Sequence, residues 1–357
     1  MSEIDWSKYY LRDLPIPGKL PRVDVKSPDE RINGRIFYEP AVHMALEHLS
    51  GYVSQDVSPI LLNSKDMVLG TGKSAVLAAE YWKLMDKGEM CFWVEVTGIS
   101  PMRRILLKVA YEMSVSGAID KLKRKLTSMG GIQQGIHRAP ETKLIQRPLT
   151  RWMIGALLSQ TEDFPIALAN VTIKTKAFSV ADAFIFLLEL YNRFVSKRIF
   201  IFLDQLEIYV RYTNARQIAL EMNELQRGIS DKAILLATMH TDALVKLQEK
   251  CGPDVETFLE NAPVIQLPQY SANDLVDIGL FLLSKFRKGQ AERFYPFTSE
   301  SLGHVAKKSG NNIRRFLVRM RAALMLGATS GYPLLDKKFL SSETARSRVF
   351  VETPITE

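Results

Sequence analysis

Six consecutive residues, Leu69-Gly70-Thr71-Gly72-Lys73-Ser74, could hold a polyphosphate. An apolar run at 59–62 precedes them, and a helix-forming run that starts at Ala75 follows. In such a turn the backbone N–H groups and the helix N-terminus face phosphate oxygens, while the lysine reaches the β- and γ-phosphates. The serine hydroxyl ligates Mg²⁺. These residues therefore predict a phosphate-binding loop between a strand and a helix.

The loop departs from the full pattern, G-x-x-x-x-G-K-[ST], at its first position. Met67 stands where that pattern has glycine, so a residue with a side chain must adopt a turn that glycine usually adopts. The half that faces the phosphates, from Gly70 to Ser74, is intact. Nucleotide binding is therefore the favoured interpretation, and an ordinary strand-to-helix turn is the alternative.

A second apolar run ends in a carboxylate. Residues 199–204 read Ile-Phe-Ile-Phe-Leu-Asp, so that Asp204 closes the run. A carboxylate in this place holds the water shell of the Mg²⁺ that accompanies a bound nucleotide. We therefore expect this strand to lie beside the strand at 59–62, with Ser74 and Asp204 binding Mg²⁺ and Lys73 binding the phosphates.

Hydrolysis also needs a carboxylate that deprotonates the attacking water. Most enzymes with this arrangement have Glu directly after the Asp, but this chain has Gln205, which can orient a water and cannot take its proton. Glu207 is the candidate base; otherwise hydrolysis is slow and the protein mainly senses nucleotide. A later strand, 233–238, ends near Thr238 and His240, which are candidates for contacting the γ-phosphate. A turn histidine is the alternative for His240.

The elements that would position these residues alternate along the chain. Apolar runs rich in aromatic and β-branched residues predict five strands. They lie at 59–62, 90–96, 198–204, 233–238 and 263–267. Helical spacing before and between them predicts helices at 39–52, 75–87, about 101–117, 152–158, 180–194, 215–228 and 243–250, and 165–173 is a candidate for a short extra strand. Strands that alternate with helices predict an α/β fold with a parallel sheet.

The remaining segments predict appended parts. We expect an extended arm at 1–34, a core at 35–268, an all-helical lid at 269–328 and a tail at 329–357 that is extended from Ser341. The lid helices are expected at 272–286, 299–308 and 313–326. Arg314 and Arg315 open the last of these, where a cation that faces the phosphates would couple the lid to the nucleotide state. A salt-bridged surface pair is the alternative.

An insertion at about 118–178 is basic. Its cations include Lys121, Lys123, Arg124, Lys125 and Arg138, and a glycine-rich loop spans 130–135. A basic helix followed by a loop can follow a phosphate backbone, because ammonium and guanidinium groups displace counterions without reading bases. Nucleic-acid binding is therefore predicted, DNA ahead of RNA. A solvated basic face is the alternative, since no interleaved aromatic residues support base stacking.

Composition sets the outer limits. The chain has 357 residues, 46% of them hydrophobic and 24% charged, with a formal net charge of +8, as in a packed and mildly basic protein. Two cysteines and five histidines show no ligand spacing, so no metal cluster is predicted and a reducing compartment fits best. The N-terminus has no signal pattern and no apolar run approaches 20 residues, which favours a cytoplasmic location without membrane contact.

Taken together, these motifs resemble the AAA+ and STAND group of P-loop ATPases over residues 35–328. The lid segments 295–301 and 310–317 are similar in sequence to archaeal origin-recognition initiators and to transposition ATPases. The segment from Asp204 to Glu207 is similar to the Asp-Gln-Phe-Glu variant of STAND switches. The resemblance implies a parallel five-stranded sheet in the order 5-1-4-3-2 and ATP with Mg²⁺ as cofactors. It also implies Arg314 as the lid sensor, and a DNA-gripping insertion after the second helix.

Two departures from that group keep alternatives open. The stretch 246–261, where oligomeric members carry an arginine finger, contains no arginine, although Arg216 or Arg227 could substitute. No winged-helix domain is recognisable after the lid, so sequence-specific DNA reading is not expected. The leading interpretation is an ATP-dependent switch, a slow ATPase, that acts with nucleic acid. The alternatives are a STAND-like signalling or assembly protein with a protein partner or a homo-oligomer, and a degenerate P-loop subunit that binds ATP or GTP structurally.

Overall fold

The computed structural model describes most of the chain, in two compact units. The described residues are 4–16, 25, 40–64, 72–96, 102–137, 147–175, 180–195, 198–208, 217, 221, 229, 232–251, 262–267 and 269–350. One unit, called here the sheet unit, comprises 49–63 and 80–265; the other, the helical unit, comprises 1–48, 64–79 and 266–357. Helices α2 (Pro40–Ser54) and α3 (Lys73–Asp86) each have residues in both.

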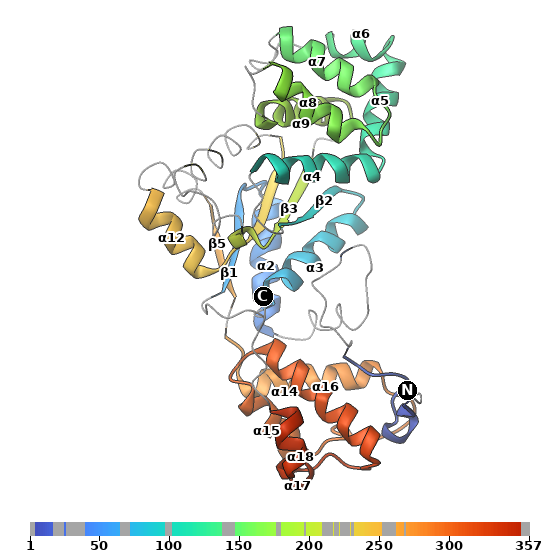
Figure 1. Ribbon diagram of the computed structural model, residues 1–357, viewed down its shortest axis with the longest axis vertical. Helices are drawn as coiled ribbons and strands as arrows, with labels where there is room; N and C mark the ends of the chain where they lie inside the picture. Colours follow the sequence, from blue (N-terminus) through green and yellow to red (C-terminus); the bar gives the residue numbers. More distant parts are fainter. Residues whose placement is uncertain are drawn as a thin grey trace. The chain divides into compact units, whose positions relative to one another are not determined.

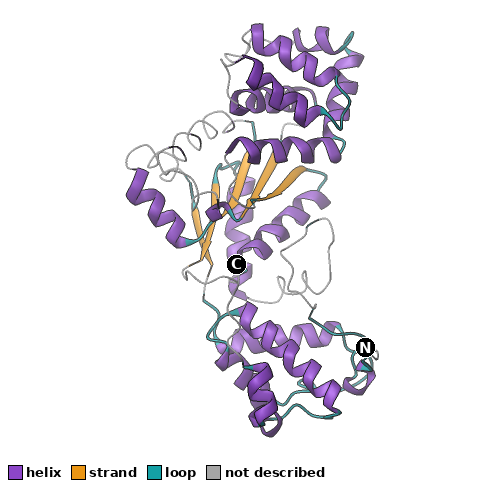
Figure 2. Ribbon diagram, in the orientation of Figure 1, coloured by secondary structure: helices purple, strands orange, loops and turns teal. Residues whose placement is uncertain are grey.

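A five-stranded sheet forms the centre of the sheet unit (Figure 2). Its strands are β1 (Ile60–Ser64), β2 (Met90–Glu95), β3 (Ile199–Asp204), β4 (Ile234–Thr238) and β5 (Val264–Leu267). The order β2-β3-β4-β1-β5 confirms the predicted order, and the pairs β2–β3, β3–β4 and β4–β1 are parallel. One expectation was wrong: β3 does not lie beside β1, because β4 lies between them.

Both faces of the sheet are apolar because successive side chains of a strand point to opposite faces. Phe92 and Ile201 belong to the large buried cluster that also contains residues of α4 (Met102–Val115) and α9 (Val180–Phe194). On the other face, Trp93 stacks on Phe202 with ring centroids 6.0 Å apart, and Tyr81 of α3 contacts both rings edge-on. Near-continuous apolar runs are what strands covered on both faces require.

The insertion folds as a cluster of helices next to α4 (Figure 1). Its members are α5 (Ala118–Ser128), α6 (Ile132–His137), α7 (Arg147–Leu158) and α8 (Phe164–Thr175). Two expectations are corrected here. The extra strand at 165–173 is helical, since Phe164 and Leu168 are buried one turn apart, and the glycine-rich stretch 130–135 turns at Gly130 and Gly131 and then enters α6.

Helix α12 (Thr241–Cys251) follows β4 and corresponds to the helix predicted at 243–250. The helix predicted at 215–228 falls almost entirely outside the described residues.

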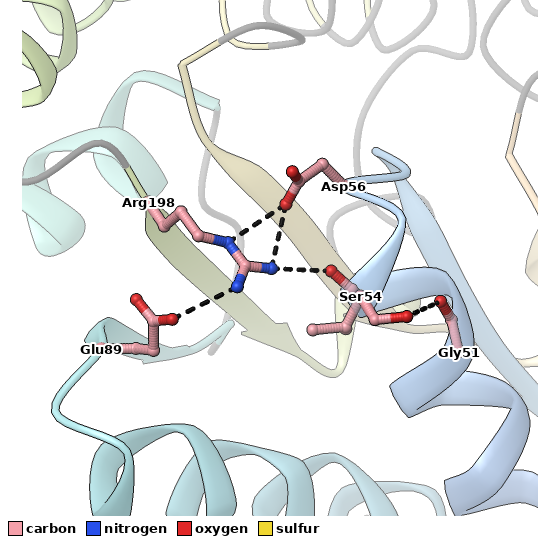
Figure 3. A network of polar contacts seen from close by, with 6 residues as sticks. Gly51, Ser54, Asp56, Glu89 and Arg198 are labelled. Atoms are coloured by element: carbon pink, nitrogen blue, oxygen red, sulfur yellow. Dashed lines mark hydrogen bonds and ion pairs between the residues drawn. The ribbon is translucent and has the colours of Figure 1, made fainter.

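The edge of the sheet where the strands start is here called the amino edge. An arginine at this edge connects several elements (Figure 3). Arg198, one residue before β3, donates to Asp56 at 2.9 Å, to Glu89 at 3.3 Å and to the Val53 carbonyl at 2.9 Å. Its guanidinium carbon also lies over the ring of Phe200, 5.2 Å from the ring centroid. Arg198 thereby links the end of α2 and the start of β2 to β3.

The elements in the C-terminal part of the helical unit are all α-helices (Figure 1). They are α14 (Ala272–Lys285), α15 (Ser299–Lys308), α16 (Ile313–Ser330), α17 (Lys337–Ser341) and α18 (Glu343–Val349). The first three confirm the predicted helices. The expectation of an extended tail from Ser341 was wrong, because Ser342 caps α18, which packs on α16 and α17 and buries Ala345 and Val349.

The described part of the N-terminal arm packs on this helical part. The short 3₁₀ helix η1 (Trp6–Tyr9) buries Tyr9, whose hydroxyl donates to the Tyr332 carbonyl at 2.7 Å. Leu11 forms a β-bridge with Arg287.

Candidate nucleotide site

The described half of the phosphate loop lies in the helical unit. Gly72 has φ of 90°, a left-handed conformation that favours glycine, and a Cβ built on it would lie 2.8 Å from the Tyr270 hydroxyl. Lys73 is the first residue of α3, and its Nζ donates to Ser64 Oγ at 3.3 Å. Glycine is therefore required here by the backbone conformation and by space. Leu69, Gly70 and Thr71 lie outside the described residues.

Ser74 and Ala75 follow Lys73 in the first turn of α3. The Ala75 and Val76 N–H groups donate to the Gly72 carbonyl, both at 3.0 Å, and the positive end of the helix dipole at this position suits an anion. Lys73 is 6% exposed, which places its ammonium group in a buried setting at the same helix end.

The predicted residues of the sheet unit meet at the ends of the strands, here called the carboxyl edge. Asp204 is 1% exposed and its Oδ1 accepts a hydrogen bond from the Thr238 hydroxyl at 2.7 Å. The same hydroxyl accepts from the Gln205 backbone N–H at 2.8 Å. Thr238 thus fixes both the carboxylate and the peptide that follows it, a role different from the predicted contact with the γ-phosphate.

Glu207 and His240 also come together at this edge. Glu207 Oε1 lies 3.1 Å from His240 Nε2, and both residues are buried. The second carboxylate oxygen of Glu207 is buried and has no hydrogen-bond partner among the described residues. Two of the residues predicted for catalysis therefore form a pair, and Glu207 Oε2 remains as an acceptor.

One functional group at this edge was missed by the sequence prediction. Glu95, the last residue of β2, pairs in register with Asp204, and its Oε1 accepts a hydrogen bond from Gln205 Nε2 at 3.2 Å. Gln205 has φ of 64°, a conformation that costs a residue with a side chain about 1–2 kcal/mol. A polar residue that closes an otherwise apolar strand was the available signal, because Glu95 ends the run 90–94 as Asp204 ends 199–203.

Arg314 and Arg315 lie in the first turn of α16 and are exposed. The side chain of Asn312 caps that helix by accepting from the Arg315 backbone N–H at 2.9 Å. The cap explains Asn312 by its place before the helix, and both guanidinium groups lie on the surface of the helical unit.

The basic residues of the insertion separate into two kinds. Lys121, Arg124 and Lys125 are exposed on the outer side of α5, opposite the buried Leu122 and Leu126. Lys123 instead turns into the insertion. Arg138 lies outside the described residues.

Lys123 is partly buried and serves the insertion itself. Its Nζ donates to the Ser159 carbonyl at 2.7 Å and to Thr161 Oγ1 at 3.2 Å. Burial lowers the pKa of Lys123, and the nearby Asp120 carboxylate opposes that shift. Lys123 therefore ties α5 to the connection between α7 and α8.

Two features are absent from the part of the chain that the structure describes. No group of three or more His, Cys, Asp or Glu side chains in the described ranges could hold a metal ion by itself. None of the helices that the structure describes is long and apolar enough to cross a membrane.

Comparison with known proteins shows the fold. No family model matches the sequence, and no curated protein matches it. Among solved structures, the Aeropyrum pernix ORC2 protein in its ADP form is similar, with 14% identity and a TM-score of 0.51 over 96% of this chain and 72% of that one. Cdc6p from Pyrobaculum aerophilum is similar with 12% identity and a TM-score of 0.52 over 86% and 68%. The likeness agrees with the fold class that the motifs predict.

Proposed function

We propose that this chain, which has the AAA+-type P-loop ATPase fold of the archaeal origin-recognition proteins, binds ATP with Mg²⁺ and acts as a slowly hydrolysing switch on nucleic acid. The observation that carries the proposal is the hydrogen-bonded group of Asp204, Gln205 and Thr238 at the carboxyl edge. In open α/β sheets, ligands bind outside the carboxyl ends of the strands.

The sheet order supports one shared nucleotide. β1 and β3 each pair with β4 in parallel, so both strands end at the carboxyl edge. Neighbouring strands are about 4.8 Å apart, which puts the ends of β1 and β3 about 10 Å apart. A triphosphate with its metal ion is long enough to span that distance across the end of β4, and the phosphate loop follows β1 in the sequence. The solved ADP form of the Aeropyrum pernix protein, which has the same fold, also supports a nucleotide.

The residues fit Mg²⁺ and ATP by their chemistry. Mg²⁺ prefers oxygen ligands and is usually held by one or two protein groups together with phosphates. Asp204 is a buried carboxylate whose Oδ1 accepts from the Thr238 hydroxyl, and a carboxylate oxygen is a ligand of the kind that Mg²⁺ prefers. In the proposal Ser74 and Asp204 hold Mg²⁺, Lys73 binds the β- and γ-phosphates, and the N–H groups from Gly70 to Ala75 surround them.

The chain also supplies groups for hydrolysis and for reading the nucleotide state. The carboxylate that takes the proton of the attacking water is Glu207, as predicted, or Glu95. His240 holds Glu207 at 3.1 Å. Arg314, exposed in the first turn of α16, is the proposed lid sensor, because a cation that contacts the terminal phosphate would change its contacts when that phosphate leaves.

For nucleic acid the support lies in α5. Lys121, Arg124 and Lys125 form one exposed cationic side on a helix whose other side is anchored by buried apolar residues. Arg138 extends this group in sequence. Such a rigid row of cations binds phosphates by releasing counterions and carries no base specificity, so duplex DNA of any sequence is the expected ligand.

Nucleotide binding is tested by isothermal titration of the full chain with ATP or GTP, each with Mg²⁺ and with EDTA. We expect ATP binding that Mg²⁺ strengthens. If neither nucleotide binds in Mg²⁺, the proposal is wrong. Tight binding without phosphate release would instead favour a structural role for the nucleotide.

Nucleic-acid binding is tested by the salt dependence of the affinity for a fluorescent DNA duplex. Replacing Lys121, Arg124 and Lys125 by Gln should reduce the slope of log K against log salt by about 3. Lys123→Met is the matched control: because this side chain serves the insertion, it should lower thermal stability and leave the slope unchanged. A wild-type protein that binds no DNA at low salt, and a protein partner recovered by pull-down, would favour the STAND-like alternative.

A further inference from the structure

Hydrolysis usually requires a carboxylate directly after Asp204. This chain has an amide there, at Gln205, and has a carboxylate at Glu95, the last residue of β2. The two side chains are joined by the hydrogen bond from Gln205 Nε2 to Glu95 Oε1, 3.2 Å long. We propose that Glu95 is the general base of ATP hydrolysis and that Gln205 orients the attacking water. This inference rests on the proposed function.

The position of Glu95 is fixed by the sheet. Glu95 and Asp204 are register partners on neighbouring parallel strands, so their side chains leave the same face of the sheet. The Val96 N–H donates to the Asp204 carbonyl at 2.9 Å, which extends the ladder past Glu95. Lys108 of α4 donates to the Glu95 carbonyl at 3.2 Å. The backbone that carries the carboxylate is therefore held from both sides.

The conformation of Gln205 serves this pair. Its backbone is left-handed, with φ of 64°, and its N–H is held by Thr238 Oγ1 at 2.8 Å. A strained conformation of this kind persists only where surrounding contacts fix it. Donation from Nε2 to Glu95 leaves the side-chain oxygen of Gln205 as an acceptor, and an acceptor is what a water needs in order to be oriented.

Glu207 is placed less well for this task. Its Oε1 is engaged by His240 at 3.1 Å, its Oε2 is buried, and the residue is 7% exposed in the short helical segment 206–208 beyond the strand. Glu95 is half-buried at the strand end itself. In this assignment Glu207 and His240 form a positioning pair that supports the turn after Asp204.

The step balances as ordinary hydrolysis. The attacking water donates one hydrogen bond to the side-chain oxygen of Gln205, and its other proton passes to Glu95 through one bridging water. The water oxygen forms a bond to the γ-phosphorus, the bond from that phosphorus to the β,γ-bridging oxygen breaks, and ADP and inorganic phosphate are released. A bridging water is included because β2 lies one strand spacing, about 4.8 Å, farther from β1 in the sheet than β3 does. A longer proton path makes hydrolysis slow.

The test compares four variants of the full chain: Glu95→Gln, Glu207→Gln, the exchange Glu95→Gln with Gln205→Glu, and Glu89→Gln as the matched control. Glu89 directly precedes the same strand at the amino edge. Phosphate release at saturating Mg·ATP is measured beside the equilibrium affinity for labelled ATP and the melting temperature. The pH profile of turnover is recorded for each active variant.

We expect Glu95→Gln to lower kcat by about 100-fold or more, the usual contribution of a general base, with the ATP affinity within about twofold. The double variant Glu95→Gln with Gln205→Glu should restore turnover, because the same side-chain hydrogen bond forms and the carboxylate now stands on β3 instead of β2. The acidic limb of its pH profile of turnover should shift relative to the wild-type chain. Glu89→Gln should turn over normally. Glu207→Gln should change turnover by less than about tenfold.

Several outcomes overturn the assignment. Normal turnover by Glu95→Gln with intact binding excludes Glu95 as the base. Loss of turnover in Glu207→Gln alone, with an unchanged melting temperature, returns that role to Glu207. A wild-type chain that binds ATP and releases no phosphate means that the pair is not catalytic. A chain that binds no nucleotide overturns the proposed function and the assignment with it, and the binding titration distinguishes this case from the others.

Discussion

The two edges of the sheet hold charged side chains in different ways. At the amino edge, Arg198 is surrounded by the carboxylates of Asp56 and Glu89, whose side chains are 65% and 23% exposed. At the carboxyl edge, Asp204 and Glu207 are buried, and their partners are a hydroxyl and an imidazole.

The contrast indicates that the amino edge contributes to the stability of the fold, and that the carboxyl edge is suited to binding a ligand. Opposite charges that meet in water satisfy one another and add a modest amount of stability. Carboxylates positioned by a hydroxyl and an imidazole at the strand ends offer oxygen ligands to a bound cation. Substitutions at the amino edge should therefore change the free energy of unfolding, and substitutions at the carboxyl edge should change nucleotide binding and turnover.

The largest effect is expected at the phosphate loop that follows the carboxyl edge. Lys73→Ala removes the ammonium group that the proposal places on the β- and γ-phosphates, and ATP affinity should fall at least about 100-fold, or about 2.7 kcal/mol. Lys83→Ala, in the same helix α3, removes a lysine that bonds Ser50 and should leave the affinity unchanged. Equal ATP affinities of the two variants would remove Lys73 from the site.

Thr238→Val should have the next largest effect, and it should lower both the free energy of unfolding and the rate of ATP turnover. The hydroxyl accepts from the Gln205 N–H and donates to Asp204, so its loss leaves a buried donor unsatisfied at a cost of about 1–3 kcal/mol. Turnover should fall about 10- to 100-fold, because Asp204 and Gln205 lose their common support. Urea unfolding and phosphate release measure the two effects.

Thr127→Val serves as the control for this substitution, since Thr127 is exposed on α5 and bonds only within its own helix turn in the described contacts. Full turnover by Thr238→Val would show that the carboxyl-edge network does not organise the site.

The amino edge is tested by Arg198→Gln, with a smaller expected effect. Two ion pairs and a bond to the Val53 carbonyl are lost, which should lower the free energy of unfolding by about 1 kcal/mol, and less at high salt. Turnover and ATP affinity should not change. Arg193→Gln on the exposed side of α9 controls for loss of charge. A large loss of turnover would break the distinction between the two edges.

The smallest effect is expected for Asp56→Asn. The Asp56 side chain is 65% exposed, so its ion pair with Arg198 should contribute at most about 0.5 kcal/mol. Asparagine tolerates the left-handed backbone, φ 55°, that Asp56 adopts. Thermal melting at low and high salt measures the difference. A loss above that seen for Arg198→Gln would mean that Asp56 has a further role at this edge.

The sequence predicted the strands well because each is an apolar run covered on both faces. It could not supply their neighbours: β3 was expected beside β1, and only the family resemblance implied that β4 separates them. The run at 165–173 was assigned to a strand because short apolar runs do not distinguish a strand from a buried helix. The capping residues Asp336 and Ser342 could have revealed α17 and α18.

For the site, local motifs predicted Lys73, Ser74 and Asp204, since spacing along the chain carries their chemistry. Glu95 was missed because its partner Gln205 is 110 residues away, and no short motif connects them. Lys123 was grouped with the exposed cations because composition does not show which side of α5 a lysine leaves; its neighbour Leu122 is buried.

The central claim is that Asp204 and Lys73 serve one magnesium-bound nucleotide. It is tested most directly by the ratio of ATP affinities measured with Mg²⁺ and with EDTA. The account predicts that Mg²⁺ strengthens binding at least about tenfold in the wild-type chain and in Arg198→Gln, and hardly at all in Asp204→Asn. An undiminished effect of Mg²⁺ in Asp204→Asn would contradict it.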